Sequence, residues 1–246
     1  MDHPAHTADS DAAIVSLLQP NRLWSAAEIV NGFAHVPKAA GVYAWYFNEV
    51  PPGVPTNGCH TNPNGQVLLY VGIAPKEAKT ATKPSTRTLR DRLRDHLVGN
   101  AEGSTLRLTL GCLLAEQLGI RLRRVGSGKR HTFTNPGEIV LDRWLAAHAH
   151  IAIAVVEQPW AVESRLLSQL CLPLNLSGNV AHPFAAQLSR LRGAAKLKAA
   201  TLPVIIDNGG PRRVSGVSEQ WNLPLNDPID AVSLCQRLFA EVIHSP

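Results

Sequence analysis

Two apolar segments of strand length stand out in the first part of the chain. Residues 41–47 read Gly-Val-Tyr-Ala-Trp-Tyr-Phe, and residues 67–71 read Val-Leu-Leu-Tyr-Val. Both are rich in β-branched and aromatic residues, which favour the pleated surface of a sheet. The intervening residues 51–65 are rich in Pro, Gly and Asn and carry no apolar repeat, which is typical of a long loop. The pattern therefore predicts an antiparallel hairpin with an oversized connection.

Helical periodicity dominates the rest of the chain. Leu89, Leu93 and Leu97 recur every four residues and predict an amphipathic helix that begins at Ser85 or Thr86. Capping residues, apolar repeats and proline breaks predict the remaining elements. These are helices from Ser10 to before Pro20, over residues 104–118, from Pro136 to Leu145, from Pro159 to before Pro173, and over residues 183–199 and 230–243, a short basic hairpin over residues 120–134, and strands over residues 151–156 and 203–206.

These elements predict an α+β fold in which a small antiparallel or mixed sheet is flanked by helices. The chain has 246 residues and is 45% hydrophobic, which is enough to bury a core. We predict a loose tail at residues 1–12 and one domain at residues 13–200, with an insert at about 98–156. Residues 201–246 are predicted to form an appendage whose role the sequence leaves open.

Composition narrows the environment of the protein. No apolar run approaches the ~20 residues that a membrane span needs, and the polar, His-rich start of the chain resembles neither a signal nor a transit peptide. The four cysteines, at positions 59, 112, 171 and 235, are widely scattered without a CxxC pair. We expect them to be small buried residues in a reducing cytoplasm rather than disulfides or a zinc site.

Positive charge is concentrated in one stretch of the chain. The formal net charge is +5, but residues 83–130 alone hold 11 Lys and Arg against 4 Asp and Glu. A concentrated basic stretch in an otherwise nearly neutral protein is typical of a surface that binds a polyanion. It is also the composition of an ordinary solvated basic face, and charge alone does not separate the two interpretations.

Polar side chains that could take part in catalysis occur on the predicted hairpin. Tyr43 ends the tripeptide Gly41-Val-Tyr, and Tyr70 begins the tripeptide Tyr-Val-Gly72. A glycine in a strand lets another backbone or a ligand approach closely. Taken alone, however, strand tyrosines are more typical of half-buried packing residues.

Two later segments add groups that could act on a phosphate. Arg92 and His96 are four residues apart and project from one face of their helix, where they could hold a phosphate and move a proton, or form a solvated basic face. Glu163 lies early in a helix, and Asn175 follows the break at Pro173. A single carboxylate can place Mg²⁺, which keeps several waters, although a Glu there also interacts favourably with the helix dipole.

Together these residues resemble the GIY-YIG nuclease superfamily. The resemblance covers roughly residues 40–183, with long inserts, and depends on five individually weak motifs in the family's order. The matching features are Gly41-Val-Tyr43, Tyr70-Val-Gly72, the helix with Arg92-x-x-x-His96, Glu163, and Pro173-Leu-Asn175.

The resemblance implies roles for the residues of the hairpin and the first helix. Tyr43 would be the general base or would orient the attacking water, and Tyr70 would donate a hydrogen bond near the scissile phosphate. Arg92 would stabilise the charge that grows on that phosphate, while His96 would assist proton transfer or hold Tyr43 in place. Because Arg92 and a metal ion favour the phenolate, we predict a lowered pKa for Tyr43.

The resemblance also implies a cofactor and a substrate. Glu163 would bind one Mg²⁺ or Mn²⁺ ion, and Asn175 would brace the site. The expected function is a metal-dependent endonuclease that hydrolyses DNA, with RNA as the less favoured substrate, in restriction, defence or repair. The alternatives are a nucleic-acid-binding module that does not cut and a structural protein with chance motif matches.

The sequence departs from the family pattern after the second glycine motif. Ile73 and Ala74 stand where several relatives place a lysine, so either Lys76 substitutes or that function is missing. The large basic insert is expected to contact DNA or to be structural. The residues predicted to bind nucleic acid are Lys76, Arg90, Arg94, Arg107, Arg121, Arg123, Arg124, Lys129 and Arg130.

Overall fold

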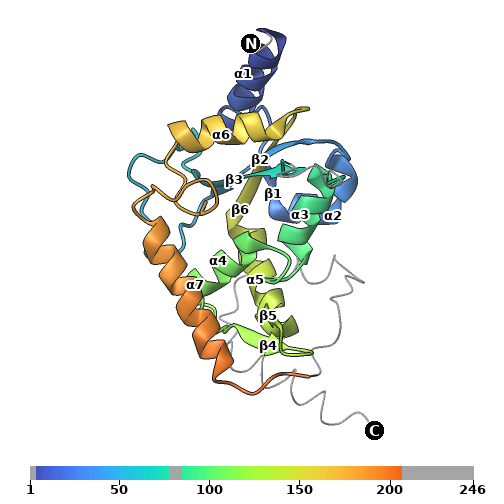
Figure 1. Ribbon diagram of the computed structural model, residues 1–246. Coiled ribbons are helices and arrows are strands. Elements are labelled where there is room, and N and C mark those ends of the chain that lie inside the picture. Colours follow the sequence, from blue (N-terminus) through green and yellow to red (C-terminus); the bar gives the residue numbers. More distant parts are fainter. Residues whose placement is uncertain (1–3, 78–84, 207–246) are drawn as a thin grey trace.

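The computed structural model describes residues 4–77 and 85–206 (Figure 1). At its centre is a four-stranded sheet with the strand order β1-β6-β2-β3, in which every pairing is antiparallel. The predicted hairpin and the α+β fold with a small antiparallel sheet are therefore confirmed. The strands of this sheet are β1 (Trp24–Ser25), β2 (Gly41–Phe47), β3 (Val67–Ala74) and β6 (Ala149–Val155).

Helices surround the sheet in the described part of the chain. They are α1 (Pro4–Leu18), α2 (Ala26–Asn31), α3 (Leu89–Val98), α4 (Thr105–Leu113), α5 (Thr134–His148), α6 (Pro159–Gln169) and α7 (Ala185–Ala200), with a short 3₁₀ helix at Phe33–His35. None of the helices in the described ranges is both long and apolar enough to cross a membrane.

The two faces of the sheet carry separate apolar clusters. Alternate residues of β2 point to opposite faces, so Val42 and Ala44 join the cluster under α1 and α6. Tyr43 and Trp45 join the larger cluster under α2, α3 and α5. Figure 1 shows α6 and α1 on one side of the sheet and α3, α4 and α5 on the other. The candidate site residues on β2 and α3 thus lie on the same side of the sheet.

Helix α3 forms as its apolar stripe predicts. Leu89, Leu93 and Leu97 are fully buried against the sheet. The helix begins later than expected because Thr88 is the N-cap: its hydroxyl accepts a hydrogen bond from the Asp91 N–H, and the Asp91 carboxylate accepts one from the Thr88 N–H. This reciprocal capping satisfies backbone N–H groups that a helix start otherwise leaves free.

A β-bulge in the hairpin changes which residues of β3 face α3. Trp45 lies opposite Tyr70, whereas the next residue, Tyr46, lies opposite Leu68, so Leu69 is an extra residue in β3. Both Leu69 and Tyr70 consequently pack toward the larger cluster. A bulge re-aims the side chains beside it, and here it brings the second phenol to the same face as the first.

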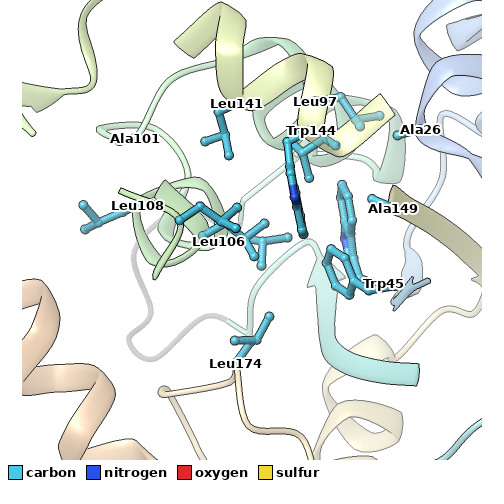
Figure 2. Packing of buried hydrophobic residues seen from close by; sticks show 14 of the residues in the cluster. Ala26, Trp45, Leu97, Ala101, Leu106, Leu108, Leu141, Trp144, Ala149 and Leu174 are labelled. Atoms are coloured by element: carbon cyan, nitrogen blue, oxygen red, sulfur yellow. The ribbon is translucent and has the colours of Figure 1, made fainter. Parts of the chain in front are cut away.

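The remaining elements extend the larger cluster away from the sheet. The predicted basic hairpin forms as β4 (Arg123–Val125) and β5 (Arg130–Thr132), and α7 packs against α4 and β4. Figure 2 shows Leu106 of α4 and Leu141 and Trp144 of α5 in one cluster with Trp45. The strand predicted at residues 203–206 is reduced to a single bridge between Ile205 and Val125.

Several predicted boundaries differ from the structure. The tail predicted at residues 1–12 overlaps helix α1, which begins at Pro4 in the structure. The strand predicted inside the insert is β6, which lies between β1 and β2 and so belongs to the central sheet. The sequence interpretation missed α2, although Ser25 and Glu28 form a capping box at its start. The helix predicted at residues 230–243 lies outside the described residues.

Candidate active site

Tyr43 and His96 form the buried centre of the candidate site. The Tyr43 hydroxyl lies 2.8 Å from His96 Nε2, and the two residues are 1% and 0% exposed. The Tyr70 ring lies 6.2 Å from the imidazole ring, centroid to centroid, at 75°. The hairpin and α3 therefore bring together the two phenols and the imidazole that the motifs named.

The glycines of both motifs allow this close approach. A Cβ atom on Gly72 would lie 2.5 Å from the Tyr43 hydroxyl, so a side chain there would displace the phenol. A Cβ atom on Gly41 would lie 2.2 Å from the Ala154 carbonyl oxygen and 2.7 Å from Leu89 Cδ1, between β6 and the start of α3. Gly72 thus leaves room for the Tyr43 ring to lie across β3, and Gly41 lets the start of α3 approach the sheet.

Ser104 is a site residue that the sequence interpretation did not name. Its hydroxyl lies 2.7 Å from His96 Nδ1, and it is fully buried. The same hydroxyl accepts a hydrogen bond of 3.1 Å from the Arg107 N–H as the N-cap of α4. Both ring nitrogens of His96 are therefore engaged, one by Tyr43 and one by Ser104. A serine at the start of the predicted helix gave a capping signal, but nothing in the sequence links it to His96.

His96 is held in its neutral form. Burial lowers its pKa well below the usual value, and the nearby charges of Arg92 and Arg107 act in the same direction. A neutral imidazole has one N–H donor and one acceptor nitrogen. One nitrogen of His96 can therefore donate to its partner while the other accepts.

Arg92 lies beside both phenols at the partly exposed side of the cluster. Its side chain is 15% exposed and donates a 3.0 Å hydrogen bond from Nη1 to Asp95. Its Nε is buried without a hydrogen-bond partner among the described residues. Burial raises the pKa of both Tyr43 and Tyr70, and the Arg92 charge offsets part of that rise. A guanidinium with a free N–H beside two phenols is suited to an anionic ligand.

The predicted lowering of the Tyr43 pKa is wrong for the chain on its own. Burial raises that pKa well above its ordinary value, and the neighbouring Tyr70 adds to the rise. Arg92 acts in the predicted direction but does not overcome the desolvation of a fully buried phenolate. Tyr43 is consequently a neutral phenol that hydrogen-bonds to His96.

Glu163 projects from α6 close to the same phenols. Its charge raises the pKa of Tyr43 and of Tyr70, an effect that requires proximity. The carboxyl group is half-buried, and its own pKa is raised by burial and lowered by the charge of Lys76. Helix α6 packs beside β3, the edge strand of the sheet. The Glu163 charge thus acts on both phenols, and the Lys76 charge acts on Glu163.

The donor set of the site suits a hard, largely hydrated cation. Within the described ranges, no group of three or more His, Cys, Asp and Glu side chains could hold a metal ion. Glu163 thus offers a single, partly exposed carboxylate. Mg²⁺ is commonly held by one or two carboxylates together with several waters and substrate phosphates. This residue fits such an ion, whereas a fully protein-built metal cage is not formed by the described residues.

Asn175 pairs with the free edge of β3. Its side-chain amide donates to the Val71 carbonyl oxygen at 2.8 Å, and its Oδ1 accepts from the Val71 N–H at 2.9 Å. Leu174 N–H donates to the Leu69 carbonyl at 3.1 Å. The segment after α6 therefore acts like an additional strand on both sides of Tyr70.

Arg107 is not a nucleic-acid contact, contrary to the prediction. It is fully buried, with 2.7 and 2.8 Å ion pairs to Glu138 and Asp142 of α5. Its Nη1 also donates to the carbonyl oxygens of His96 and Leu97 at 3.1 and 3.2 Å. The guanidinium therefore joins α4 and α5 to the last turn of α3, which carries His96.

Three other arginines predicted to bind nucleic acid donate hydrogen bonds to backbone carbonyl groups of the protein. Arg90 donates to the carbonyl oxygens of Val36 at 2.7 Å and Ala34 at 3.0 Å. Arg123 donates to Pro203, and Arg124 donates to three carbonyl groups around the C-terminal end of α7. The predicted residues whose side chains are exposed are Lys76, Arg94, Arg121, Lys129 and Arg130.

The fold and the site define an α+β domain in which a hairpin, a helix with Arg and His, and a later Glu surround one buried and one half-buried phenol. A sequence model described as the GIY-YIG catalytic domain matches residues 41–194 of this chain. The chain therefore belongs to the GIY-YIG family, and its function is of the nuclease type. Neither the curated proteins nor the solved structures that were compared contain a match.

Proposed function

We propose that the protein is a metal-dependent endonuclease that hydrolyses phosphodiester bonds in DNA. The observation that carries this proposal is the buried hydrogen bond between Tyr43 and His96, with Arg92 and Glu163 beside it. Phosphodiester hydrolysis needs an activated water, stabilisation of the developing negative charge and a neutralised leaving oxygen. The residues present can supply each of these requirements.

The proton path begins at Tyr43. Because its phenol is neutral and lies 2.8 Å from His96 Nε2, it can pass its proton to the imidazole while its oxygen takes a proton from the attacking water. This transfer requires Nε2 to be the acceptor nitrogen. The required tautomer carries its proton on Nδ1 and donates it to the Ser104 hydroxyl at 2.7 Å. Ser104 is thus a positioning residue in the proposal.

Charge stabilisation falls to Arg92 and to the group held by Glu163. Arg92 presents a buried Nε without a partner among the described residues and can donate to a non-bridging phosphate oxygen. A divalent ion held by Glu163 would supply a Lewis acid for the leaving oxygen. Asn175 keeps the β3 edge, and with it Tyr70, in register through its two hydrogen bonds to Val71.

Exposed basic side chains favour a nucleic-acid substrate. Burial raises the pKa of Glu163, and the charge of the exposed Lys76 partly offsets that rise, so Lys76 can contact a phosphate beside the scissile bond. Arg121, Lys129 and Arg130, on and beside the β4–β5 hairpin, are exposed as well. Lys and Arg side chains that bind the backbone supply affinity for duplex DNA without sequence preference.

A cleavage assay tests the proposal. Supercoiled plasmid incubated with the full chain and Mg²⁺ or Mn²⁺ should become nicked or linear, and Glu163→Gln should abolish the reaction while still binding plasmid. The matched control is Glu157→Gln, which changes an exposed carboxylate just before α6 and should keep full activity. Binding without cleavage of DNA or RNA under either metal would overturn the proposal and favour a module that binds nucleic acid without cutting it.

A further inference from the structure

Two cysteines that are far apart in the sequence meet beside a histidine. Cys59 lies in the β2–β3 loop and Cys171 follows α6, yet their Sγ atoms are 3.2 Å apart. Cys171 Sγ is also 3.3 Å from His182 Nε2. Both thiols are free and only half-buried. The sequence predicted isolated buried cysteines, and it could not show this contact because 112 positions separate the pair.

Hydrogen bonds in this cluster have a defined direction. His182 Nδ1 accepts a 3.1 Å hydrogen bond from the Phe184 N–H, so the proton of the neutral ring is on Nε2 and points to Cys171. The Cys59 thiol has one proton and two acceptors within reach, the Cys171 sulfur at 3.2 Å and the Pro55 carbonyl oxygen at 3.8 Å, and the shorter contact is to Cys171. With the Cys59 proton in the shorter contact, Cys171 Sγ accepts hydrogen bonds from both Cys59 and His182.

The Cys59 thiol is difficult to ionise. Burial raises the pKa of the Cys59 thiol to about 12, and its hydrogen bond to Cys171 contributes to the rise. Since the thiolate is the nucleophile in sulfur exchange, the two sulfurs are not equivalent: Cys171 is arranged to react first and Cys59 to follow.

We propose that Cys59 and Cys171 form a thiol–disulfide exchange site whose substrate is a low-molecular-weight disulfide of the glutathione type. The Cys171 thiolate attacks one sulfur of this disulfide, forms a mixed disulfide and releases one thiolate. Cys59 then transfers its proton to that thiolate, attacks the Cys171 sulfur and displaces the second small thiolate, which takes a proton from water. The two protein thiols are oxidised to one disulfide, and the small disulfide is reduced to two thiols.

The geometry favours closure of this bond. The sulfurs need to move from 3.2 Å to the ~2 Å length of a disulfide, a shift of about 1 Å. The backbones are close as well, because a Cβ atom on Gly58 would lie 4.0 Å from Cys171 Cβ. The product would link the β2–β3 loop to the segment whose Asn175 pairs with β3.

Peptide mapping of the oxidised full chain tests the proposal. A variant with Cys112→Ser and Cys235→Ser keeps only the pair, and it is incubated with oxidised glutathione in the presence of a chelator. The intact mass should fall by two hydrogens, alkylation should find no free thiol, and digestion should release one peptide pair joined through Cys59 and Cys171. Dithiothreitol should restore both thiols.

Two further variants distinguish an exchange site from two cysteines that lie close together by chance. Cys59→Ser should stop at a stable glutathione adduct on Cys171, and His182→Phe should slow formation of that adduct about 10-fold. Folding is checked in each sample by the thermal unfolding midpoint. The proposal fails if folded protein carries glutathione separately on both cysteines without the internal bond, or if loss of His182 leaves the rate at Cys171 unchanged.

Discussion

At the residue scale, the proposed catalysis centres on one phenol whose surroundings oppose its ionisation. Tyr43 is buried, and its pKa is raised rather than lowered. A stored phenolate is therefore disfavoured, and the proposed transfer of the Tyr43 proton to His96 has to occur in concert with attack of water. Motif matching predicted which residues meet, whereas the protonation state depends on burial that the motif does not reveal.

Tyr43→Phe should lower plasmid cleavage by about 100-fold or more, the usual range for losing a general base, without weakening plasmid binding. Tyr46→Phe is the matched control, because Tyr46 lies on the opposite face of the sheet and donates to the Leu17 carbonyl at 2.8 Å. The control should lose about 1 kcal/mol of stability and keep its cleavage rate. Equal rates for Tyr43→Phe and wild type would remove Tyr43 from the mechanism.

Ser104→Ala should lower the cleavage rate about 10-fold and leave plasmid affinity unchanged, because it removes the partner of His96 Nδ1. A merely structural role is separated by ¹⁵N spectra of the imidazole, which report the position of the ring proton. The wild type should carry that proton on Nδ1, and the variant should show a mixture of tautomers. Ser104→Thr retains the hydroxyl and should restore both signals. A wild-type proton on Nε2 would contradict the proposed direction of transfer.

The lowered pKa of His96 predicts a loss of stability in mild acid. In the unfolded chain this histidine binds a proton below about pH 6.5, whereas burial keeps it neutral in the folded protein until a much lower pH. Its contribution to stability is thus complete above about pH 6.5 and is lost as the pH falls, by up to about 1.4 kcal/mol per pH unit. Urea titrations at each pH from 7.5 to 5 give the free energy of unfolding, which should fall more steeply with decreasing pH in the wild type than in His96→Gln. The same pH dependence in both proteins would show that His96 is not held neutral.

At the element scale, the local patterns predicted more than the long-range pairings. The strands β2 and β3 and the stripe of α3 followed from periodicity, and the antiparallel pairing followed from their order. The bulge at Leu69 and the central place of β6 did not, because both depend on which strands pair and in which register. The same limit applies to Asn175, whose place beside Pro173 gave the motif but not its partner strand.

Asn175 should contribute more to stability than its single side chain suggests, because it satisfies both backbone groups of Val71 at a sheet edge. Asn175→Ala should cost about 1–3 kcal/mol by leaving a buried N–H and carbonyl unpaired. Asn175→Asp keeps the acceptor for the Val71 N–H but places a carboxylate against the Val71 carbonyl, so it should not recover the loss. Urea denaturation measures both. A wild-type midpoint for Asn175→Ala would show that β3 does not depend on this pairing.

At the scale of the whole molecule, one charge cluster connects α4 and α5 to the helix that carries His96. Arg107 of α4 binds Glu138 and Asp142 of α5 and the carbonyl oxygen of His96 at the end of α3. The two carboxylates lie 31 and 35 positions away in the sequence. Net charge predicted a basic insert, but it could not show that this arginine is neutralised inside the protein. The insert therefore both supports His96 and carries exposed basic residues.

Buried and exposed arginines of the insert should separate in two measurements. Arg107→Ala removes the ion pairs of two buried carboxylates and should destabilise the protein by about 3–5 kcal/mol. Arg121→Ala removes an exposed charge and should leave stability within about 0.5 kcal/mol of wild type.

If Arg121 contacts a phosphate, its loss should weaken plasmid binding at low salt. It should also reduce the slope of log affinity against log salt by about 1, equally for unrelated DNA sequences. Lys129→Ala and Arg130→Ala serve as repeats on the β4–β5 hairpin. An unchanged salt slope in all three exposed variants would place the DNA contact elsewhere, because a charge that binds a phosphate releases a counterion when it does so.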